Sequence, residues 1–179
     1  RGVRYRVAFI PDPVCWTDAP EDIATLAKQR KRWHRGLAES LWENRKLCFA
    51  KGSGASGWIA FPFFVVFELL SPVVEVGGFI VMGVAFAIGM MTGTSFLAFV
   101  AAAFALGVML STTALLLEEL SFHTYPKARH VFALFIVAIF ENFGYRQVMS
   151  VWKLQALYGW VTGQRIVWGD MKRKANWQQ

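Results

Sequence analysis

The residues best suited to chemistry lie in the stretch Lys28–Gly36, which reads KQRKRWHRG. Five of these residues carry a fixed positive charge, and a Gln and a Trp stand among them. Guanidinium groups bind phosphate and carboxylate through paired hydrogen bonds, so a dense basic cluster suits an anionic ligand. An indole ring packs well on the apolar face of a sugar. The stretch therefore predicts a site for a ligand that is both anionic and sugar-like.

Helical spacing divides this stretch into two groups. At about 100° per residue, Gln29, Arg32 and Trp33 share one sector, and Gly36 lies in the same sector one turn further on. A glycine there leaves room for a bound group to approach the backbone. A basic amphipathic helix on a membrane surface, with Trp33 as its anchor, explains the same spacing. The remaining cations point elsewhere and fit an anionic headgroup layer: Lys28, Lys31 and Arg35.

The helix that carries these residues is expected from about residue 19 to about residue 47. Asp18 is its predicted N-cap, with Glu21 three residues later and Pro20 in the first turn. Capping explains the two carboxylates better than an acid–base pair does. The predicted apolar stripe of the helix consists of Ile23, Leu26, Leu37 and Leu41.

The composition is that of a membrane protein. Hydrophobic residues make up 55% of the 179 residues and charged residues 17%, against about 25% charged in soluble domains. No Lys, Arg or His occurs between Gly52 and Phe122. Residues 95–117 are long enough to span a bilayer, which takes about 20 apolar residues. Residues 58–91 predict one kinked, tilted helix or an interfacial half followed by a span, and the short turn at 92–94 predicts an antiparallel hairpin.

Two carboxylates fall within the first apolar segment. Glu68 and Glu75 are seven residues apart and lie roughly on one helical face. They are interpreted either as a hydrophilic wall of a translocation path or as residues at headgroup level. The spacing does not choose between these alternatives.

After the second span, Lys127–His130 forms a basic loop, which the positive-inside rule places in the cytoplasm together with the Arg30–Arg35 cluster. Residues 131–140 and 148–160 are two further apolar runs, for which we expect a re-entrant or interfacial arrangement or two short helices that return to the cytoplasm.

His123 and His130 have no partners at metal-ligand spacing, so no zinc site is expected. Cys15 and Cys48 are interpreted as free thiols.

The first residues, Val3–Ile10, alternate like a β-strand, and a single strand needs a sheet to join. We therefore expect the chain to be the C-terminal portion of a longer protein. The predicted organisation is the end of a catalytic domain in residues 1–18, an amphipathic interface helix in 19–50, a transmembrane helical region in 58–150 and a basic cytoplasmic or interfacial tail in 151–179.

Gln29–Trp33 resembles the Q-x-x-R-W motif of processive family 2 glycosyltransferases, which include the cellulose, hyaluronan, chitin and poly-N-acetylglucosamine synthases. The preceding Pro11–Pro20 is similar to the segment that leads into this motif in bacterial members. Glu141–Gln147 and Trp168–Arg173 resemble C-terminal segments of the same group. The resemblance thus covers essentially the whole chain.

The resemblance implies a mainly α-helical, polytopic protein of the bacterial inner membrane, with the Q-x-x-R-W helix on the cytoplasmic face and a short strand remaining from a GT-A catalytic domain. Arg32 would contact the donor diphosphate, Trp33 would stack under the acceptor sugar, and Gln29 would hydrogen-bond near either one. The general base and the ligands of a divalent metal, Mg or Mn, are expected upstream of residue 1. Asp18 is too close to Gln29 to be that base, and this chain alone is expected to be inactive.

The implied reaction transfers a sugar from a nucleotide-sugar donor, with UDP-N-acetylglucosamine as the first candidate, to a growing polysaccharide that enters the membrane. The expected partners are this donor, the polymer, the lipid bilayer and an accessory membrane subunit, but no nucleic acid. Two other functions compete: a transporter or channel component whose basic helix binds lipid, and a structural scaffold.

Overall fold

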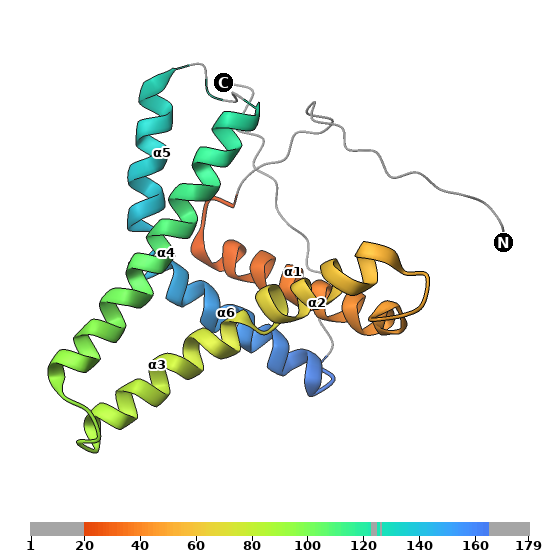
Figure 1. The fold of residues 1–179 in the computed structure, drawn as a ribbon, viewed down its shortest axis with the longest axis horizontal. Coiled ribbons are helices and arrows are strands. Elements are labelled where there is room, and N and C mark those ends of the chain that lie inside the picture. The colour runs from red at the N-terminus through yellow and green to blue at the C-terminus, as the bar shows by residue number, and fades with distance from the viewer. Residues whose placement is uncertain (1–19, 123–124, 126, 165–179) are drawn as a thin grey trace.

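The computed structural model describes residues 20–122, 125 and 127–164, and all the regular structure among them is helical. The predicted strand at residues 3–10 and the predicted end of a catalytic domain in residues 1–18 lie outside the described residues. Six α-helices are labelled in Figure 1. Their bounds are α1 Ile23–Glu43, α2 Phe61–Phe63, α3 Ser71–Ala87, α4 Gly93–Phe122, α5 Ala128–Phe140 and α6 Tyr145–Val161.

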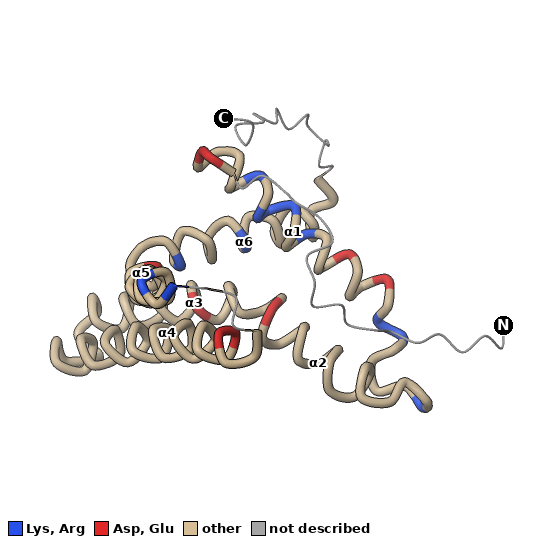
Figure 2. Tube along the Cα trace, turned by 90° about the horizontal axis from the view of Figure 1, so that it is seen from above, with Lys and Arg blue, Asp and Glu red and all other residues tan. Residues whose placement is uncertain are grey.

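These helices form two layers. Seen from above, α1 and α6 lie together on one side of α3 and α4 (Figure 2). The most extensive helix contacts join α1 to α6, followed by α3 to α6 and α4 to α5. Lys and Arg residues are concentrated on α1, with two more on α6, whereas most of α3 and α4 is uncharged (Figure 2). Helix α6 therefore connects the basic helix to the apolar ones.

The basic helix α1 begins four residues later than the sequence pattern predicts. Its N-cap is Asp22 rather than Asp18: Asp22 Oδ1 accepts a hydrogen bond from the backbone N–H of Thr25 at 2.7 Å, and Oδ2 accepts one from the Thr25 hydroxyl at 2.7 Å. These hydrogen bonds lower the pKa of Asp22, because they stabilise its charged form. Pro20 and Glu21 precede the helix, and its predicted last turn is instead a separate 3₁₀-helix at Arg45–Leu47.

The buried face of α1 also differs from the predicted apolar stripe. Of that stripe, Ile23 is 74% exposed and Leu26, Leu37 and Leu41 are half-buried, whereas the buried residues of α1 are the neighbouring His34 and Ala38. The partner helix α6 buries the small residue Ala156. Small side chains let two helix backbones approach closely. The deepest part of α1 therefore lies beside the predicted stripe, at a residue as small as Ala38.

The first apolar segment is kinked, as predicted. Two π-helices, η2 (Ser56–Ala60) and η3 (Phe64–Leu69), flank α2, and the chain then bends by 41° into α3. Pro72 lies in the first turn of α3, where its missing N–H removes no helical hydrogen bond. Helices α3 and α4 are joined by a short turn, with the rings of Phe86 and Phe96 stacked at 5.0 Å. The predicted hairpin connection is therefore present.

Helix α4 is the described helix that is long and apolar enough to cross a membrane by itself. Its 30 residues have a mean hydropathy of 2.1 over the most apolar window. Two pairs of consecutive helices, each bent at a short break, are long and apolar enough only when the pair is counted as one span. These pairs are Ser56–Leu69 with α3, and α5 with α6. The described residues thus support one span, and up to three if both bent pairs cross.

The second apolar region folds as two short helices, one of the arrangements predicted for it. A bend of 63° separates α5 from α6. The predicted boundary between residues 150 and 151 falls inside α6, and α6 packs on α1. Most of the predicted tail, residues 165–179, lies outside the described residues.

A polar network joins the apolar helices at the α5–α6 bend. The fully buried Asn142 donates from Nδ2 to the Ala138 carbonyl at 2.8 Å, and its Oδ1 accepts from Arg146 at 3.3 Å. Arg146 in turn forms an ion pair with Glu75 of α3 at 3.2 Å, and Glu75 also accepts from the Ser150 hydroxyl at 2.8 Å. Glu68, in contrast, is exposed. The two glutamates predicted to share a face therefore lie in different surroundings.

Gly107 of α4 provides a test of this packing. A Cβ at position 107 would collide with Asn142 Oδ1 and Arg146 Nη1, whereas a Cβ at Gly83 of α3 would meet nothing within 4 Å. We expect Gly107→Ala to destabilise the protein by about 1–3 kcal/mol, and Gly83→Ala to be neutral or slightly stabilising. Thermal unfolding of the two variants in detergent measures the difference. Equal melting temperatures would contradict the close contact between α4 and the bend.

Candidate functional site

The three predicted ligand-binding residues occupy one open side of α1. Trp33 is 57% exposed, and Gln29 and Arg32 are half-buried. Since successive helical residues turn by about 100°, this side lies away from His34 and Ala38, which are buried. Gly36 also opens to free space: none of the described atoms beyond its own turn of helix lies within 4 Å of where a Cβ would stand. A ligand can therefore approach both the side chains and the backbone.

Arg30 occupies one of the two variable positions of the Q-x-x-R-W motif, and it contacts the tryptophan of the motif, Trp33. Its guanidinium carbon lies 4.8 Å from the centre of the Trp33 ring, within the range of a cation–π interaction. Its Nε is buried and has no hydrogen-bond partner among the described residues. Arg30 therefore covers part of the indole and restricts how the ring turns. This contact could have been predicted from the sequence, because Arg30 and Trp33 are three residues apart and such side chains lie next to each other on a helix.

His34, next to the motif, lies where three elements meet. Its side chain is buried between α1, the end of η3 at Leu69 and Lys153 of α6. The pKa of His34 is lowered from 6.5 to about 4: burial is the largest cause, the positive charge of Lys153 adds to it, and a hydrogen bond to the backbone of Leu69 opposes the shift. The imidazole is therefore neutral at neutral pH, which allows it to be buried beside a lysine.

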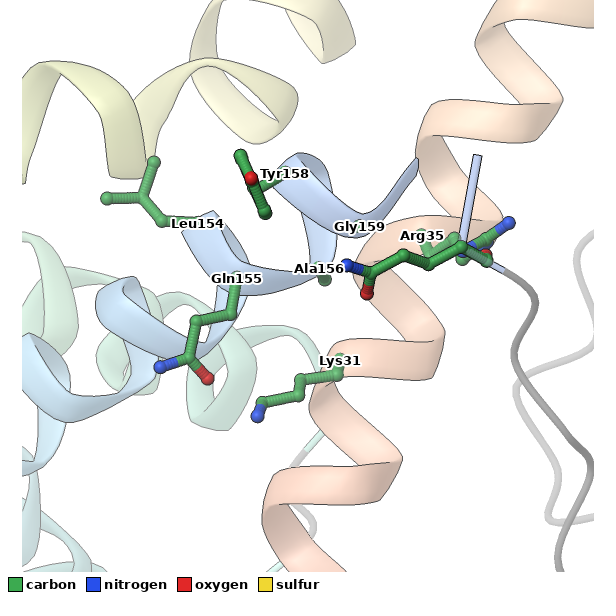
Figure 3. A pocket seen from close by; sticks show the side chains of 8 residues that line it. Lys31, Arg35, Leu154, Gln155, Ala156, Tyr158 and Gly159 are labelled. Carbon is green, nitrogen blue, oxygen red and sulfur yellow. The ribbon is translucent and has the colours of Figure 1, made fainter. Parts of the chain in front are cut away.

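Two of the cations expected to face lipid headgroups instead line a pocket between α1 and α6. Lys31 and Arg35 contribute from α1, and α6 and the residue Gln164 form the other side (Figure 3). Arg35 pairs with Glu39 at 2.7 Å and donates a second hydrogen bond to the Gln164 carbonyl oxygen. Lys28 remains exposed. The basic cluster thus faces three ways: toward Trp33, toward the pocket and toward solvent.

The described residues bring no three His, Cys, Asp or Glu side chains together in a way that could hold a metal ion. Cys48 is a half-buried free thiol, and His130 is exposed. Cys15 and His123 lie outside the described residues. The expectation that a divalent metal and a general base are held by residues upstream of this chain stays a prediction.

Comparison with known families places the chain among glycosyltransferases. The sequence pattern of the family described as "Glycosyl transferase family group 2" matches residues 2–146. The chain belongs to this family. Membership supports transferase activity in general and implies a nucleotide-sugar donor and an acceptor. Searches among curated proteins and among solved structures found no match to this chain.

The family match ends at Arg146, near the start of α6. Helix α1 and the apolar helices α3 and α4 lie inside the matched segment, and most of α6 lies beyond it. The glycosyltransferase pattern therefore covers the open side of α1 completely, whereas it covers only the α1 half of the pocket against α6.

His34 makes stability depend on pH. The folded pKa of about 4 lies below the ordinary value of 6.5, so the unfolded chain binds an extra proton between these two values. The stability that depends on neutral His34 is complete above pH 6.5 and is lost as the pH falls toward 4. We expect about 2 kcal/mol of loss between about pH 7 and about pH 5. Thermal unfolding at the two pH values measures it.

His34→Gln removes the titrating group, so its melting temperature is expected to fall less between the two pH values than that of the unaltered protein. His130→Gln, a change of the same kind at an exposed position of α5, is the control. If His34→Gln keeps the full pH-dependent loss, another group is responsible and the burial of neutral His34 is not the cause.

Proposed function

We propose that this glycosyltransferase chain is the membrane-proximal part of a processive enzyme that transfers a sugar from a nucleotide-sugar donor to a growing polysaccharide and guides the polymer into the membrane. One observation carries the proposal: Gln29, Arg32 and Trp33 share an open side of α1, and the opposite side of this helix packs on α6. A helix fixed on one side presents the other side to a ligand in a constant orientation.

Arg32 suits the donor end of the reaction. When the sugar leaves, the nucleoside diphosphate gains negative charge, and a guanidinium stabilises that charge without needing to gain or lose a proton. Trp33 suits the acceptor, because the C–H groups of a sugar pack on an indole face. Gln29 lies one turn before both and can hydrogen-bond to sugar hydroxyls. The proposed donor is a UDP-sugar, with UDP-N-acetylglucosamine as the first candidate.

The neighbouring helices support a site at a membrane surface. Helix α6 links α1 to α3, which precedes the apolar, 30-residue helix α4. The basic residues of α1 and of Lys127–His130, which form the start of α5, favour the cytoplasmic face of the inner membrane under the positive-inside rule. A polymer bound at Trp33 would then begin its passage beside the apolar helices.

Conservative changes in the motif test this function. In the full-length protein, Arg32→Lys is expected to lower polymer synthesis by at least about 100-fold, since a lysine loses the planar fork that binds diphosphate. Trp33→Phe is expected to nearly abolish synthesis, because the smaller ring covers less of the sugar. Incorporation of labelled sugar into polymer by membranes that contain equal amounts of each variant measures the effect.

The same helix and its end offer matched controls. Trp42 is 57% exposed, as Trp33 is, and Arg45 lies over its ring at 4.5 Å. Trp42→Phe and Arg45→Lys therefore make the same chemical changes at a similar exposed pair outside the motif, and near-normal synthesis is expected. If both motif variants are as mild as these controls, the helix serves as a basic membrane anchor rather than a substrate site.

Arg30 is expected to act as a positioning residue for Trp33. Arg30→Gln removes the cation–π contact, which contributes about 0.5–2 kcal/mol, and should raise the KM for an oligosaccharide acceptor several-fold with little change in kcat. Arg30→Lys should restore most of the KM, because it keeps the cation. Arg45→Gln is the control. Equal losses of kcat in Arg30→Gln and Arg30→Lys would indicate a direct role in catalysis instead.

A further inference from the structure

The pocket between α1 and α6 has no part in the proposed sugar transfer. It has a volume of about 490 Å³. By the helical turn of about 100° per residue, its α1 residues, Lys31 and Arg35, lie on the side of the helix opposite Trp33. Its other wall comes from α6 and Gln164 (Figure 3). A ligand bound there would not compete with a donor or acceptor at Trp33.

The pocket has an electropositive wall. None of the described residues that line it is acidic. The positive charge of Arg35 is largely balanced by its ion pair with Glu39 at 2.7 Å, and its second contact, to the Gln164 carbonyl, holds the guanidinium in place. Lys31 is therefore the main source of net charge. Figure 3 shows Lys31 and the amide of Gln155 extending from facing helices into the same space.

The opposite wall is largely apolar. Leu154, Ala156 and Gly159 line it, and Tyr158 adds an aromatic ring with one hydroxyl. Such a wall contributes nothing to binding a small inorganic anion, which has no apolar part to bury. It suits a ligand in which a phosphate is joined directly to hydrocarbon. Basic pockets between helices at a membrane surface bind the headgroups of anionic lipids in this way.

We propose that the α1–α6 pocket binds the phosphate of an anionic phospholipid, with Lys31 and Gln155 as donors to the phosphate and the Leu154–Gly159 wall against the glycerol and the first methylene groups. The bound lipid contacts both helices at once, so it strengthens the contact that orients the motif helix. This site is independent of the proposed function, since it would exist whether or not Trp33 stacks on a sugar.

The test is lipid binding by the full-length protein in detergent, followed by native mass spectrometry during titration with phosphatidylglycerol and, separately, phosphatidylcholine. We expect phosphatidylglycerol to bind preferentially. Lys31→Gln should weaken its binding about fivefold, the effect of one lysine near an anionic headgroup. Lys28→Gln is the matched control, because it removes the same charge from an exposed position of the same helix. Lys31→Arg should retain binding.

A second variant keeps the test independent of how Lys31→Gln folds. Gln155 is exposed, so Gln155→Glu is expected to fold normally while its negative charge repels the phosphate. Equal weakening by Lys28→Gln and Lys31→Gln would indicate diffuse surface attraction and overturn the pocket. Competition by inorganic pyrophosphate at concentrations similar to the lipid would identify a soluble phosphate ligand and overturn the lipid. The experiment measures lipid binding and not sugar transfer. Its outcome therefore stays interpretable even if the proposed glycosyltransferase function is wrong.

Discussion

The arrangement of the described residues depends on the contact between α1 and α6. Ala38 of α1 and Ala156 of α6 are both buried, and short side chains let two helix backbones approach closely. Because α6 also packs on α3, it transmits the position of the apolar helices to the motif helix. The open side of α1 is oriented only because its other side is held in this way.

The charged residues are also distributed differently between the layer of α1 and α6 and the layer of apolar helices. Cations concentrate on the α1 and α6 layer, where they face either Trp33, the pocket or solvent. In the apolar layer, Glu75 pairs internally with Arg146 at 3.2 Å, whereas Glu68 and Glu118 are exposed. Removing one member of such a partly buried pair leaves the other without compensation, which costs more than the pair itself contributes. The network therefore specifies which helices meet as well as stabilising them.

The sequence predicted the features that depend on local spacing. The helix over Gln29, Arg32 and Trp33 and the kink before Pro72 follow from patterns within a few turns of chain. The short connection between α3 and α4 was also expected, although it lies at residues 88–92 rather than at the predicted 92–94. The start of α1 was missed although it is local. Asp18 and Glu21 match the usual capping pattern, whereas Asp22 is followed at the third position by Thr25, whose hydroxyl and backbone both donate to it.

The features that were not predicted require a partner distant in sequence. The buried residues of α1, His34 and Ala38, lie beside the predicted aliphatic stripe rather than within it, because hydrophobic periodicity gives little weight to an alanine or a histidine. The pocket of Lys31 and Arg35 exists only once α6 is in place. The lowered pKa of His34 likewise depends on residues distant in sequence, because its surroundings include Leu69 and Lys153. The motif residues themselves could be identified, but their neighbours could not.

The ion pair across α3 and α6 also constrains the order in which the protein is assembled. The Ser150 hydroxyl that binds Glu75 lies 75 residues after it in the chain, which corresponds to about 4–15 s of synthesis at typical rates. A carboxylate without its partners is costly in hydrocarbon. Helix α3 is therefore expected to reach its final packing only after α6 has emerged, so that the last described helix completes the contacts of an early one.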